Sequence, residues 1–304
     1  MAIGANFVAD RPPLRHVMLL LLLAVIWSSA FTTIKVAVET IPPLTLVTAR
    51  MVIAGILLYA VLRLRGLRLP SRGGQWGTFF LLGLTGNSIP FFLISWGEVG
   101  IDSGPAAILM AVMPLVTVGL AHFFTESDRM TAMKFLGLAI GFGGIVVLVG
   151  PDALTHLGEK AIFEFSVAGG AVFYAITAVL TRRLPSGGDP LQRGTAVTLC
   201  AAVQMAPISL MMDAPWALTP TTPSLLAAIY LGVFPTAAAM VIYFYLIAER
   251  GTTFFALINY IIPCMGVVWG VVFLGEALAL QALIALGVIL GGVFVANLSF
   301  GRQR

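Results

Sequence analysis

Long apolar stretches alternate with short polar gaps along the whole chain. A helix needs about 20 apolar residues to cross a bilayer core of about 30 Å, so each stretch of that length predicts a membrane span. Ten stretches qualify: 17–38, 43–62, 76–96, 104–124, 133–150, 163–181, 195–212, 224–248, 252–274 and 277–299. The gaps are too short for a soluble domain, and the pattern predicts an all-α, polytopic membrane protein with ten transmembrane helices.

Composition supports this interpretation. The 304 residues are 59% apolar and 10% charged, whereas about 25% of an ordinary soluble domain is charged. Because so few charged residues cannot cover the surface of a soluble protein, we expect the lipid bilayer to surround the chain. The net charge of +4 comes from basic residues in the gaps, which indicates topology signals and no nucleic-acid partner.

Lysine and arginine are distributed unevenly between the two sides of the membrane. With a cytoplasmic N-terminus, 14 of the 17 basic residues fall on the cytoplasmic side. Lys35, Arg50 and Lys160 are the exceptions. Because cytoplasmic loops carry an excess of Lys and Arg, we expect a multi-pass protein of the cell (inner) membrane with both termini in the cytoplasm.

The two halves of the chain repeat each other at a nearly constant offset of 147 to 150 residues. The matched pairs are Trp27 and Tyr174, Lys35 and Arg182, Gly83 and Gly232, Trp96 and Tyr245, Pro114 and Pro263, Glu126 and Glu276, and Gly137 and Gly287. Each half holds five spans, an odd number, so the second half enters the membrane in the opposite sense. We therefore predict two five-helix repeats of inverted topology, residues 1–150 and 151–304, as found in secondary transporters.

Three segments resemble a known family: WSSAF at 27–31 followed by Lys35, GPAA at 104–107 leading to Pro114, and FLGE at 273–276. With the two halves, they resemble the EamA branch of the drug/metabolite transporter (DMT) superfamily, and within it the YddG-type exporters of aromatic amino acids and drugs. The resemblance covers nearly the whole chain. It implies a central cavity walled by helices 1–4 and 6–9, with helices 5 and 10 at the periphery. The first half departs from the pattern, since Glu126-Ser127 stands where the second half has Gly275-Glu276.

Glycine and proline distinguish scaffold from moving parts. Spans 5 and 10 carry Gly137-x-x-x-Gly141 and Gly287-x-x-x-Gly291, which predict close packing with helices of the same half in preference to a dimer interface. Spans 3, 4, 8 and 9 carry helix-weakening residues near mid-membrane. We interpret these as hinge candidates, with static kinks as the alternative: Gly86, Pro90, Pro114, Pro235 and Pro263.

Polar and aromatic side chains at membrane depth are the candidate substrate ligands, because they offer hydrogen bonds and flat apolar walls. They are Trp27, Ser28, Thr32, Asn87, Ser88, Trp96, Tyr174, Thr177, Tyr243, Tyr245, Asn259 and Trp269. Each has a structural alternative. The asparagines can bond across helices, the span 1 hydroxyls can bond back to their own helix, and Trp96 and Tyr245 can belong to interfacial belts.

A charged side chain inside the membrane is by default a candidate functional residue. Arg50 lies about two turns into span 2, and we expect a structural or gate ion pair with Glu39, Glu98 or Asp102, with carboxylate binding as the alternative. Lys35 and Glu39 have the i,i+4 spacing of a helical pair. The acidic residues are expected outside the span centres, with Glu98 in the connection between spans 3 and 4. This favours export down the substrate gradient over proton coupling.

The motifs for other functions do not occur in the sequence. His16, His122 and His156 do not have catalytic or metal-ligand spacing, and the sequence contains no P-loop or dinucleotide turn. We therefore expect no enzyme, no cofactor and no metal. The sequence predicts a secondary transporter that works as a monomer and exports amino acids, aromatic ones among them, and related small metabolites. A proton-coupled multidrug or metabolite exporter is the alternative, and a small-solute channel is a weaker one.

Overall fold

The computed structural model describes residues 13–71, 73–124, 131–149, 159–184, 189–255, 257–277 and 279–298, so Glu126 and His156 lie outside the described residues. Within these ranges the chain is helical, without strands. The helices are α1 (Leu14–Val38), α2 (Pro43–Leu64), α3 (Gly73–Gly83), α4 (Ile89–Gly100), α5 (Ser103–Met110), α6 (Met113–Phe124), α7 (Ala132–Val149), α9 (Glu159–Arg183), α10 (Pro190–Met212), α11 (Thr222–Leu231), α12 (Ala239–Phe255), α13 (Ile258–Leu274) and α14 (Leu280–Leu298). Short π-helical turns, η1 (Leu84–Ser88) and η3 (Gly232–Ala238), join α3 to α4 and α11 to α12.

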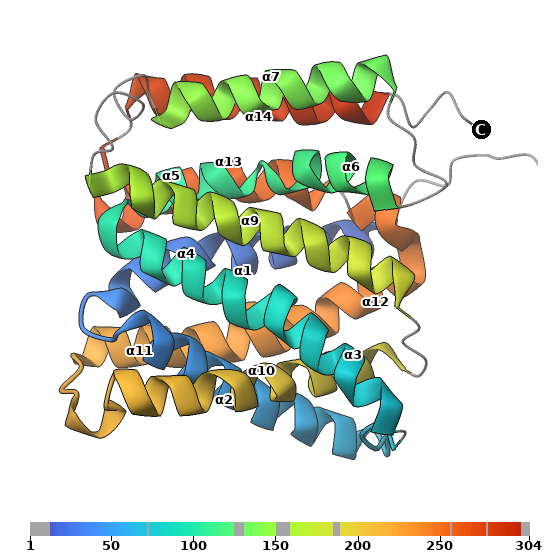
Figure 1. The fold of residues 1–304 in the computed structure, drawn as a ribbon, viewed down its shortest axis with the longest axis vertical. Coiled ribbons are helices and arrows are strands. Elements are labelled where there is room, and N and C mark those ends of the chain that lie inside the picture. Colours follow the sequence, from blue (N-terminus) through green and yellow to red (C-terminus); the bar gives the residue numbers. More distant parts are fainter. Residues whose placement is uncertain are drawn as a thin grey trace, which may run out of the picture.

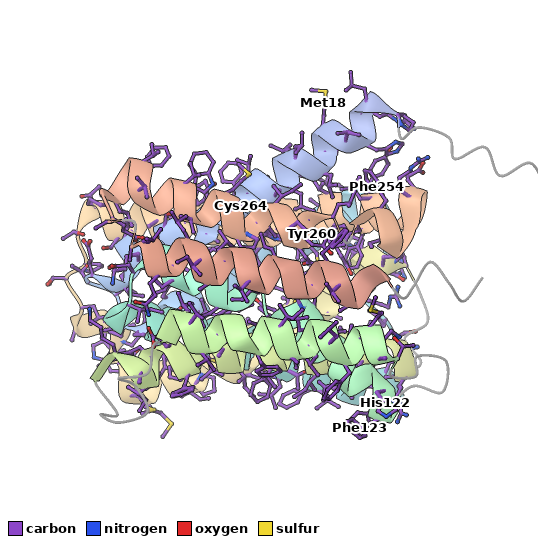
Figure 2. The ribbon with its side chains drawn as sticks, turned by 90° about the horizontal axis from the view of Figure 1, so that it is seen from above. Met18, His122, Phe123, Phe254, Tyr260 and Cys264 are labelled. Carbon is purple, nitrogen blue, oxygen red and sulfur yellow. The ribbon has the colours of Figure 1, made fainter. Side chains whose placement is uncertain are left out.

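Seven helical stretches are long and apolar enough to cross a membrane. They are Leu14–Val38, Pro43–Leu64, Gly73–Gly100, Ser103–Phe124, Lys160–Thr181, Pro190–Met212 and Thr222–Arg250. Three further apolar helices are shorter: Ala132–Leu148, Ile258–Leu274 and Leu280–Ala296. The surface of the bundle is rich in apolar side chains (Figure 2), as expected where lipid is the solvent.

Helices α7 and α14 lie against each other in the uppermost layer of Figure 1. The helices approach so closely that a Cβ atom added at Gly292 would lie 2.6 Å from the carbonyl oxygen of Gly137. A Cβ atom at Gly144 would lie 3.0 Å from the main-chain nitrogen of Ile289. Because the residue number falls along α14 as it rises along α7, the two helices are antiparallel. Glycine thus permits backbone contact where lipid provides no hydrophobic drive for association.

The small-residue prediction was therefore right for part of this layer. A side chain at Gly141 would overlap Leu115 of the same half, as predicted, but Gly137 contacts α14 of the other half. Gly287 and Gly291 have no described atom within 4 Å of an added Cβ. The motif alone does not specify which face of α14 turns inward, because this helix is apolar on all sides.

The second helices of the two predicted halves, α2 and α10, are also antiparallel neighbours. Thr45 Oγ1 at the start of α2 donates a hydrogen bond of 2.7 Å to Asp213 Oδ2, just beyond the end of α10. Farther along α2, a Cβ atom at Gly55 would lie 2.9 Å from the side chain of Leu199. In the same way, α1 packs against α11 and η3, and α4 packs against α9. Helices that correspond in the two halves thus occupy corresponding positions.

Three of the spans are interrupted near their middles. η1 contains Gly86 and precedes Pro90, whereas η3 contains Pro235. A proline removes one main-chain donor, and a π turn accommodates the missing bond by moving to i→i+5 pairing. The fourth span is interrupted between α5 and α6, just before Pro114. The helix-weakening residues of spans 3, 4 and 8 therefore coincide with real interruptions.

Two sequence-based expectations need correction here. The apolar run 252–274 predicts that Asn259 lies about two turns inside span 9, but α12 extends to Phe255 and α13 begins at Ile258, so Asn259 lies in the first turn of α13. Both cysteines lie in apolar runs, which predicts that both are buried, but only Cys200 is buried, whereas Cys264 is exposed at the bundle surface (Figure 2).

The bundle has two ends. We name one the Glu276 end: α1, α4, α10 and α13 finish there, and α2, α5, α11 and α14 begin. We name the other the Glu249 end: α1 begins there and α12 finishes, and His16 Nε2 lies 3.9 Å from a carboxylate oxygen of Glu249.

Candidate substrate-binding cavity

A cavity of about 410 Å³ lies inside the bundle, between helices of both predicted halves. This volume lies within the range of small-molecule sites. Residues from α1, α2, η1, α4, α5, α6, α9, η3, α12 and α13 line it, whereas the described residues of α7, α10 and α14 do not. The walls therefore come from spans 1–4, 6, 8 and 9 of the sequence, while span 7, which the resemblance includes, contributes no described lining residue.

One face of α1 forms much of the wall. Trp27, Ala30, Phe31 and Ile34 line the cavity, and their spacing of three, four and seven residues places them on one helical face. Trp27 Nε1 donates a hydrogen bond of 3.1 Å to the carbonyl oxygen of Pro235. That bond holds the indole ring against η3 and gives a partner to a carbonyl inside the π turn.

Aromatic rings continue the wall toward the Glu249 end. The Trp27 ring lies 5.9 Å from Phe255 in an edge-to-face arrangement, and Tyr243 lies 4.9 Å from the same phenyl ring. Rings at these separations attract each other beyond simple area burial. Phe91 and Tyr174 also line the cavity, and they form another edge-to-face pair with ring centres 6.2 Å apart.

Among the described residues that line the cavity, Arg50 is the one with a formally charged side chain. Its Nε donates a hydrogen bond of 2.7 Å to Thr236 Oγ1, and the guanidinium carbon lies 3.9 Å from the centre of the Phe91 ring. The expected ion pair is not formed, because within the described ranges the acidic side chains lie more than 4.0 Å from Arg50. Glu39 and Asp102 are instead exposed at helix ends.

Lys35 and Glu98 also differ from expectation. Lys35 Nζ donates to the carbonyl oxygens of Glu98 (2.9 Å) and Ile101 (2.7 Å), so it closes the end of α4 and makes no ion pair with Glu39. Glu98 lies inside α4 and not in a connection, is fully buried, and both its carboxylate oxygens are without hydrogen-bond partners among the described residues.

The predicted binding residues fall into two groups. Five line the central cavity: Trp27, Asn87, Tyr174, Tyr243 and Asn259. So do four predicted hinge or gate residues: Arg50, Gly86, Pro235 and Pro263. Pro90 and Pro114 lie in neighbouring turns without lining it.

The remaining candidates lie outside the lining of the central cavity. Ser88 Oγ donates 2.6 Å to Gln204 Oε1, and Thr177 Oγ1 bonds back to Phe173 within α9. Trp96 packs on Phe163 with ring centres 5.1 Å apart, and Tyr245 stacks on His16 at 5.9 Å. Trp269 Nε1 donates 2.8 Å to Ser28 Oγ, which also bonds back to Val25.

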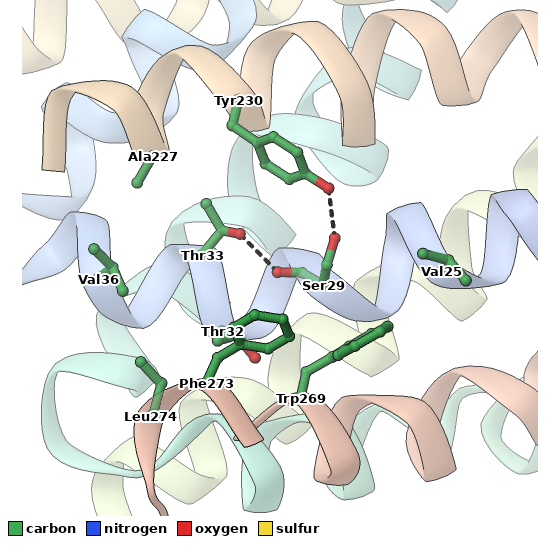
Figure 3. A pocket seen from close by; sticks show the side chains of 10 residues that line it. All are labelled: Val25, Ser29, Thr32, Thr33, Val36, Ala227, Tyr230, Trp269, Phe273 and Leu274. Carbon is green, nitrogen blue, oxygen red and sulfur yellow. Dashed lines mark hydrogen bonds between the residues drawn. The ribbon is translucent and has the colours of Figure 1, made fainter. Parts of the chain in front are cut away.

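A second hollow of about 520 Å³ lies between α1, α11 and α13 (Figure 3). Thr32 and Trp269 line it, together with Ser29 and Tyr230, whose hydroxyl oxygens lie 2.8 Å apart. Phe273 at its rim is 69% exposed. This lateral groove therefore opens on the side of the bundle, where lipid tails are the neighbours.

Sequence inspection missed the apolar part of the cavity wall. It consists of Ala30, Phe31, Ile34, Phe91, Ile94, Ala107, Met110, Ala111, Met113, Met240, Phe255 and Ile262. Apolar residues of these types also occur on lipid-facing surfaces, so their type does not identify a cavity wall. The sequence feature that could have identified them is their helical spacing from a polar residue that lines the cavity. Phe31 follows Trp27, and Phe91 follows Asn87, by four residues. Thr236 was also missed, and its signal was the adjacent Pro235.

These features define a class: a polytopic helical membrane protein with a ligand-sized cavity between helices from both halves of the chain. Residues 14–150 and 162–298 each match the model of the EamA-like transporter family, so the chain belongs to that family.

Named relatives agree with this assignment. The chain is 30% identical to "Uncharacterized inner membrane transporter YedA" of Escherichia coli K12, over 91% of this chain and 88% of the relative. It is 28% identical to a "Probable terminal-alkyne amino-acid exporter" of Streptantibioticus cattleyicolor, over 94% of both chains. A solved crystal structure matches with a TM-score of 0.66 at 22% identity, over 95% of this chain and 99% of the other, which shows likeness of fold.

Proposed function

We propose that this protein is a secondary transporter that exports amino acids, aromatic ones among them, and related small metabolites across the inner membrane by alternating access. The observation that carries the proposal is the central cavity, which is lined by both halves of the chain and bordered by the π turns η1 and η3. Gly86, Pro90, Pro114, Pro235 and Pro263 are the proposed hinges, because helices weakened at these points can bend around a site near the midplane.

The proposed architecture is ten spans in two inverted halves, residues 1–150 and 151–304. The seven long helices and three shorter apolar ones supply the spans. Support for inversion comes from the antiparallel pairs α2 with α10 and α7 with α14, each of which joins corresponding helices of the two halves. η1 and η3 also occupy corresponding repeat positions. The topology predicted from the sequence assigns 14 of the 17 basic residues to the side on which α1 begins, which supports the proposal that the Glu249 end and both termini face the cytoplasm.

The amino-acid assignment draws on the chemistry of the cavity. Trp27, Tyr174 and Tyr243 offer flat surfaces with polar edges, and Asn87 and Asn259 offer amides. The named function of the Streptantibioticus cattleyicolor relative, amino-acid export, supports the same class. We propose that the monomer is sufficient, because both halves of the cavity come from one chain.

Purified protein in liposomes tests the proposal. Vesicles loaded with amino acids, nucleosides or drug-like cations are diluted, and efflux is followed with and without external substrate. A carrier gives saturable efflux that external substrate accelerates by exchange, whereas a channel gives neither. A protein that moves none of these solutes would contradict the transporter assignment.

Glu98 favours the proton-coupled alternative. A fully buried carboxyl group whose oxygens are unpaired is costly to keep charged, and coupled carriers use such groups to bind protons. For the gradient-driven mechanism that we propose, collapsing the proton gradient leaves efflux unchanged, and Glu98→Gln transports like the wild type. If efflux is lost when the proton gradient is collapsed, and is also lost in Glu98→Gln, the proton-coupled alternative would be established.

A further inference from the structure

Arg50 is a buried cation that makes no ion pair among the described residues, and the buried Glu98 carboxyl group interacts with it only from beyond 4.0 Å. Its side chain is 5% exposed, and the acidic groups of the described chain lie more than 4.0 Å from it. The contacts with Thr236 and Phe91 orient the guanidinium but carry no negative charge. Burying an uncompensated charge is costly, so a protein that keeps one normally supplies an anion from elsewhere.

Thr236 fixes the direction of the guanidinium. The Thr236 hydroxyl donates its hydrogen to the Leu231 carbonyl oxygen at 2.8 Å, so it can only accept from Arg50 Nε. Arg50 Nε is therefore occupied. The guanidinium also has two terminal nitrogens, and Arg50 is part of the cavity wall. A planar guanidinium is well suited to binding both oxygens of one carboxylate.

Asn87 supplies a second donor in the same cavity. It lies in η1, is 7% exposed, and its Nδ2 is without an acceptor among the described residues. A buried donor left without a partner costs free energy, which a bound acceptor would recover. Arg50 and Asn87 are thus both part of the wall of one cavity, and the Asn87 amide is a buried donor at that wall.

The rest of the cavity wall determines which kind of side chain or ring system the ligand can carry. Phe31, Phe91, Met110 and Ile262 provide apolar walls, and the described lining contains no aspartate or glutamate. The cavity therefore offers an acidic group a cation and offers an ammonium group no carboxylate.

We infer that Arg50 and Asn87 bind the carboxylate of the transported substrate, which makes the substrate class organic acids with an apolar or aromatic body. This inference rests on the proposed transport function, because it identifies the group by which the same cavity holds its cargo. The free carboxylate is the required group. The amino group is dispensable, so an N-acylated amino acid binds about as well as its parent.

Matched ligand sets test this on the wild-type protein. Full-length protein in detergent is titrated with L-phenylalanine, N-acetyl-L-phenylalanine and L-phenylalaninamide, with thermal stabilisation as the measure of binding. The same three derivatives of leucine and tryptophan cover other side chains. We expect the two acids of a set to bind with similar affinity, and the amide to bind about 30-fold more weakly or worse, as when one partner of a buried charge pair is removed.

Substitutions identify the residues. Arg50→Lys keeps the charge but loses the planar fork, and we expect acid binding to weaken by about tenfold or more while amide binding stays unchanged. Asn87→Ala gives the same selective loss to a smaller degree. Gln281→Ala serves as the control, because it removes an amide that lies outside the cavity wall and leaves both proposed carboxylate donors in place.

The outcomes separate the two proposals. An amide that binds as tightly as its acid, or the absence of binding by all three amino acids, overturns the carboxylate assignment. If nucleosides or drug-like cations exchange in liposomes while the acids do not, the protein is still a transporter and the carboxylate assignment alone fails. If no solute exchanges, the transport proposal fails.

Discussion

Glu276 accepts two hydrogen bonds from Ser103 with a single carboxylate oxygen, at 2.8 Å from its main-chain nitrogen and 2.7 Å from its hydroxyl. The other oxygen accepts from the main-chain nitrogen of Gly104 at 2.9 Å. A carboxylate at a helix N-terminus satisfies free N–H groups and interacts with the helix dipole. The bonds link the end of α13 to the start of α5, two helices from different halves of the chain, at the Glu276 end.

We predict that Glu276→Gln destabilises the protein. The amide retains one oxygen but replaces the other with a donor that faces donors, and the charge at the start of α5 is lost. We expect the free energy of unfolding to fall by about 1–3 kcal/mol, measured by thermal unfolding in detergent. Glu249→Gln is the control, because that side chain is 46% exposed at the opposite end. Equal losses in both variants would show that Glu276 has no special role.

Two adjacent glycines of α14 provide a test of the layer it forms with α7. An added Cβ at Gly292 lies 2.6 Å from the Gly137 carbonyl oxygen, whereas Gly291 is open on that measure. We expect Gly292→Ala to destabilise by about 1–3 kcal/mol because main-chain atoms must separate, and Gly291→Ala to be neutral or slightly stabilising. Thermal unfolding of the two variants measures the difference. If Gly291→Ala proves the more harmful, the face of α14 has been assigned wrongly.

The proposed hinge at η3 predicts a kinetic effect. In Pro235→Ala the restored N–H favours ordinary helical bonding, so we expect the turnover rate of exchange to fall by about tenfold or more while melting temperature is kept or raised. Pro207→Ala is the control, since Pro207 lies inside α10, which lines no part of the cavity. Unchanged turnover in Pro235→Ala would favour a static kink.

The fold was predictable where a single physical signal dominates. The apolar runs located the membrane helices to within a few residues in most cases, because burying an apolar segment in lipid needs little tertiary information. Pro90 and Pro235 marked the π turns, because a missing donor weakens any helix. The sequence could not show that α4 continues through Glu98. That continuation depends on the packing of α4 against α9, a tertiary contact that the local sequence does not indicate.

Side-chain directions within a span were the harder part. Trp27 and Ser28 are adjacent, yet the first lines the cavity and the second accepts a hydrogen bond from Trp269 away from it. Ser29, Thr32 and Thr33 of α1 line the lateral groove, so polarity would indicate the wrong face of this helix for the central cavity. For Arg50 the acidic residues available in sequence suggested an ion pair, whereas packing placed its guanidinium on Phe91.

Substitution of Thr236 tests whether this residue positions the Arg50 guanidinium in the proposed carboxylate site or only stabilises the fold. Its hydroxyl is the acceptor for Arg50 Nε, so Thr236→Val removes that bond with little change in shape. A hydrogen bond to a charged group contributes about 1.5–3 kcal/mol, and we expect KM for an acid substrate to rise about tenfold or more. The turnover rate at saturation should change little, because the guanidinium still rests on Phe91.

Loss of the Thr236 hydroxyl also frees the Leu231 carbonyl oxygen, so the variant loses some stability whatever Arg50 does. Thr195→Val controls for this effect: its hydroxyl is fully buried, bonds back to Leu191 in α10 and lies outside the cavity wall. A purely structural role for Thr236 would change acid and amide binding alike, as unfolding does. A positioning role weakens acid binding alone, and rapid-mix exchange assays with the two ligand types distinguish these results.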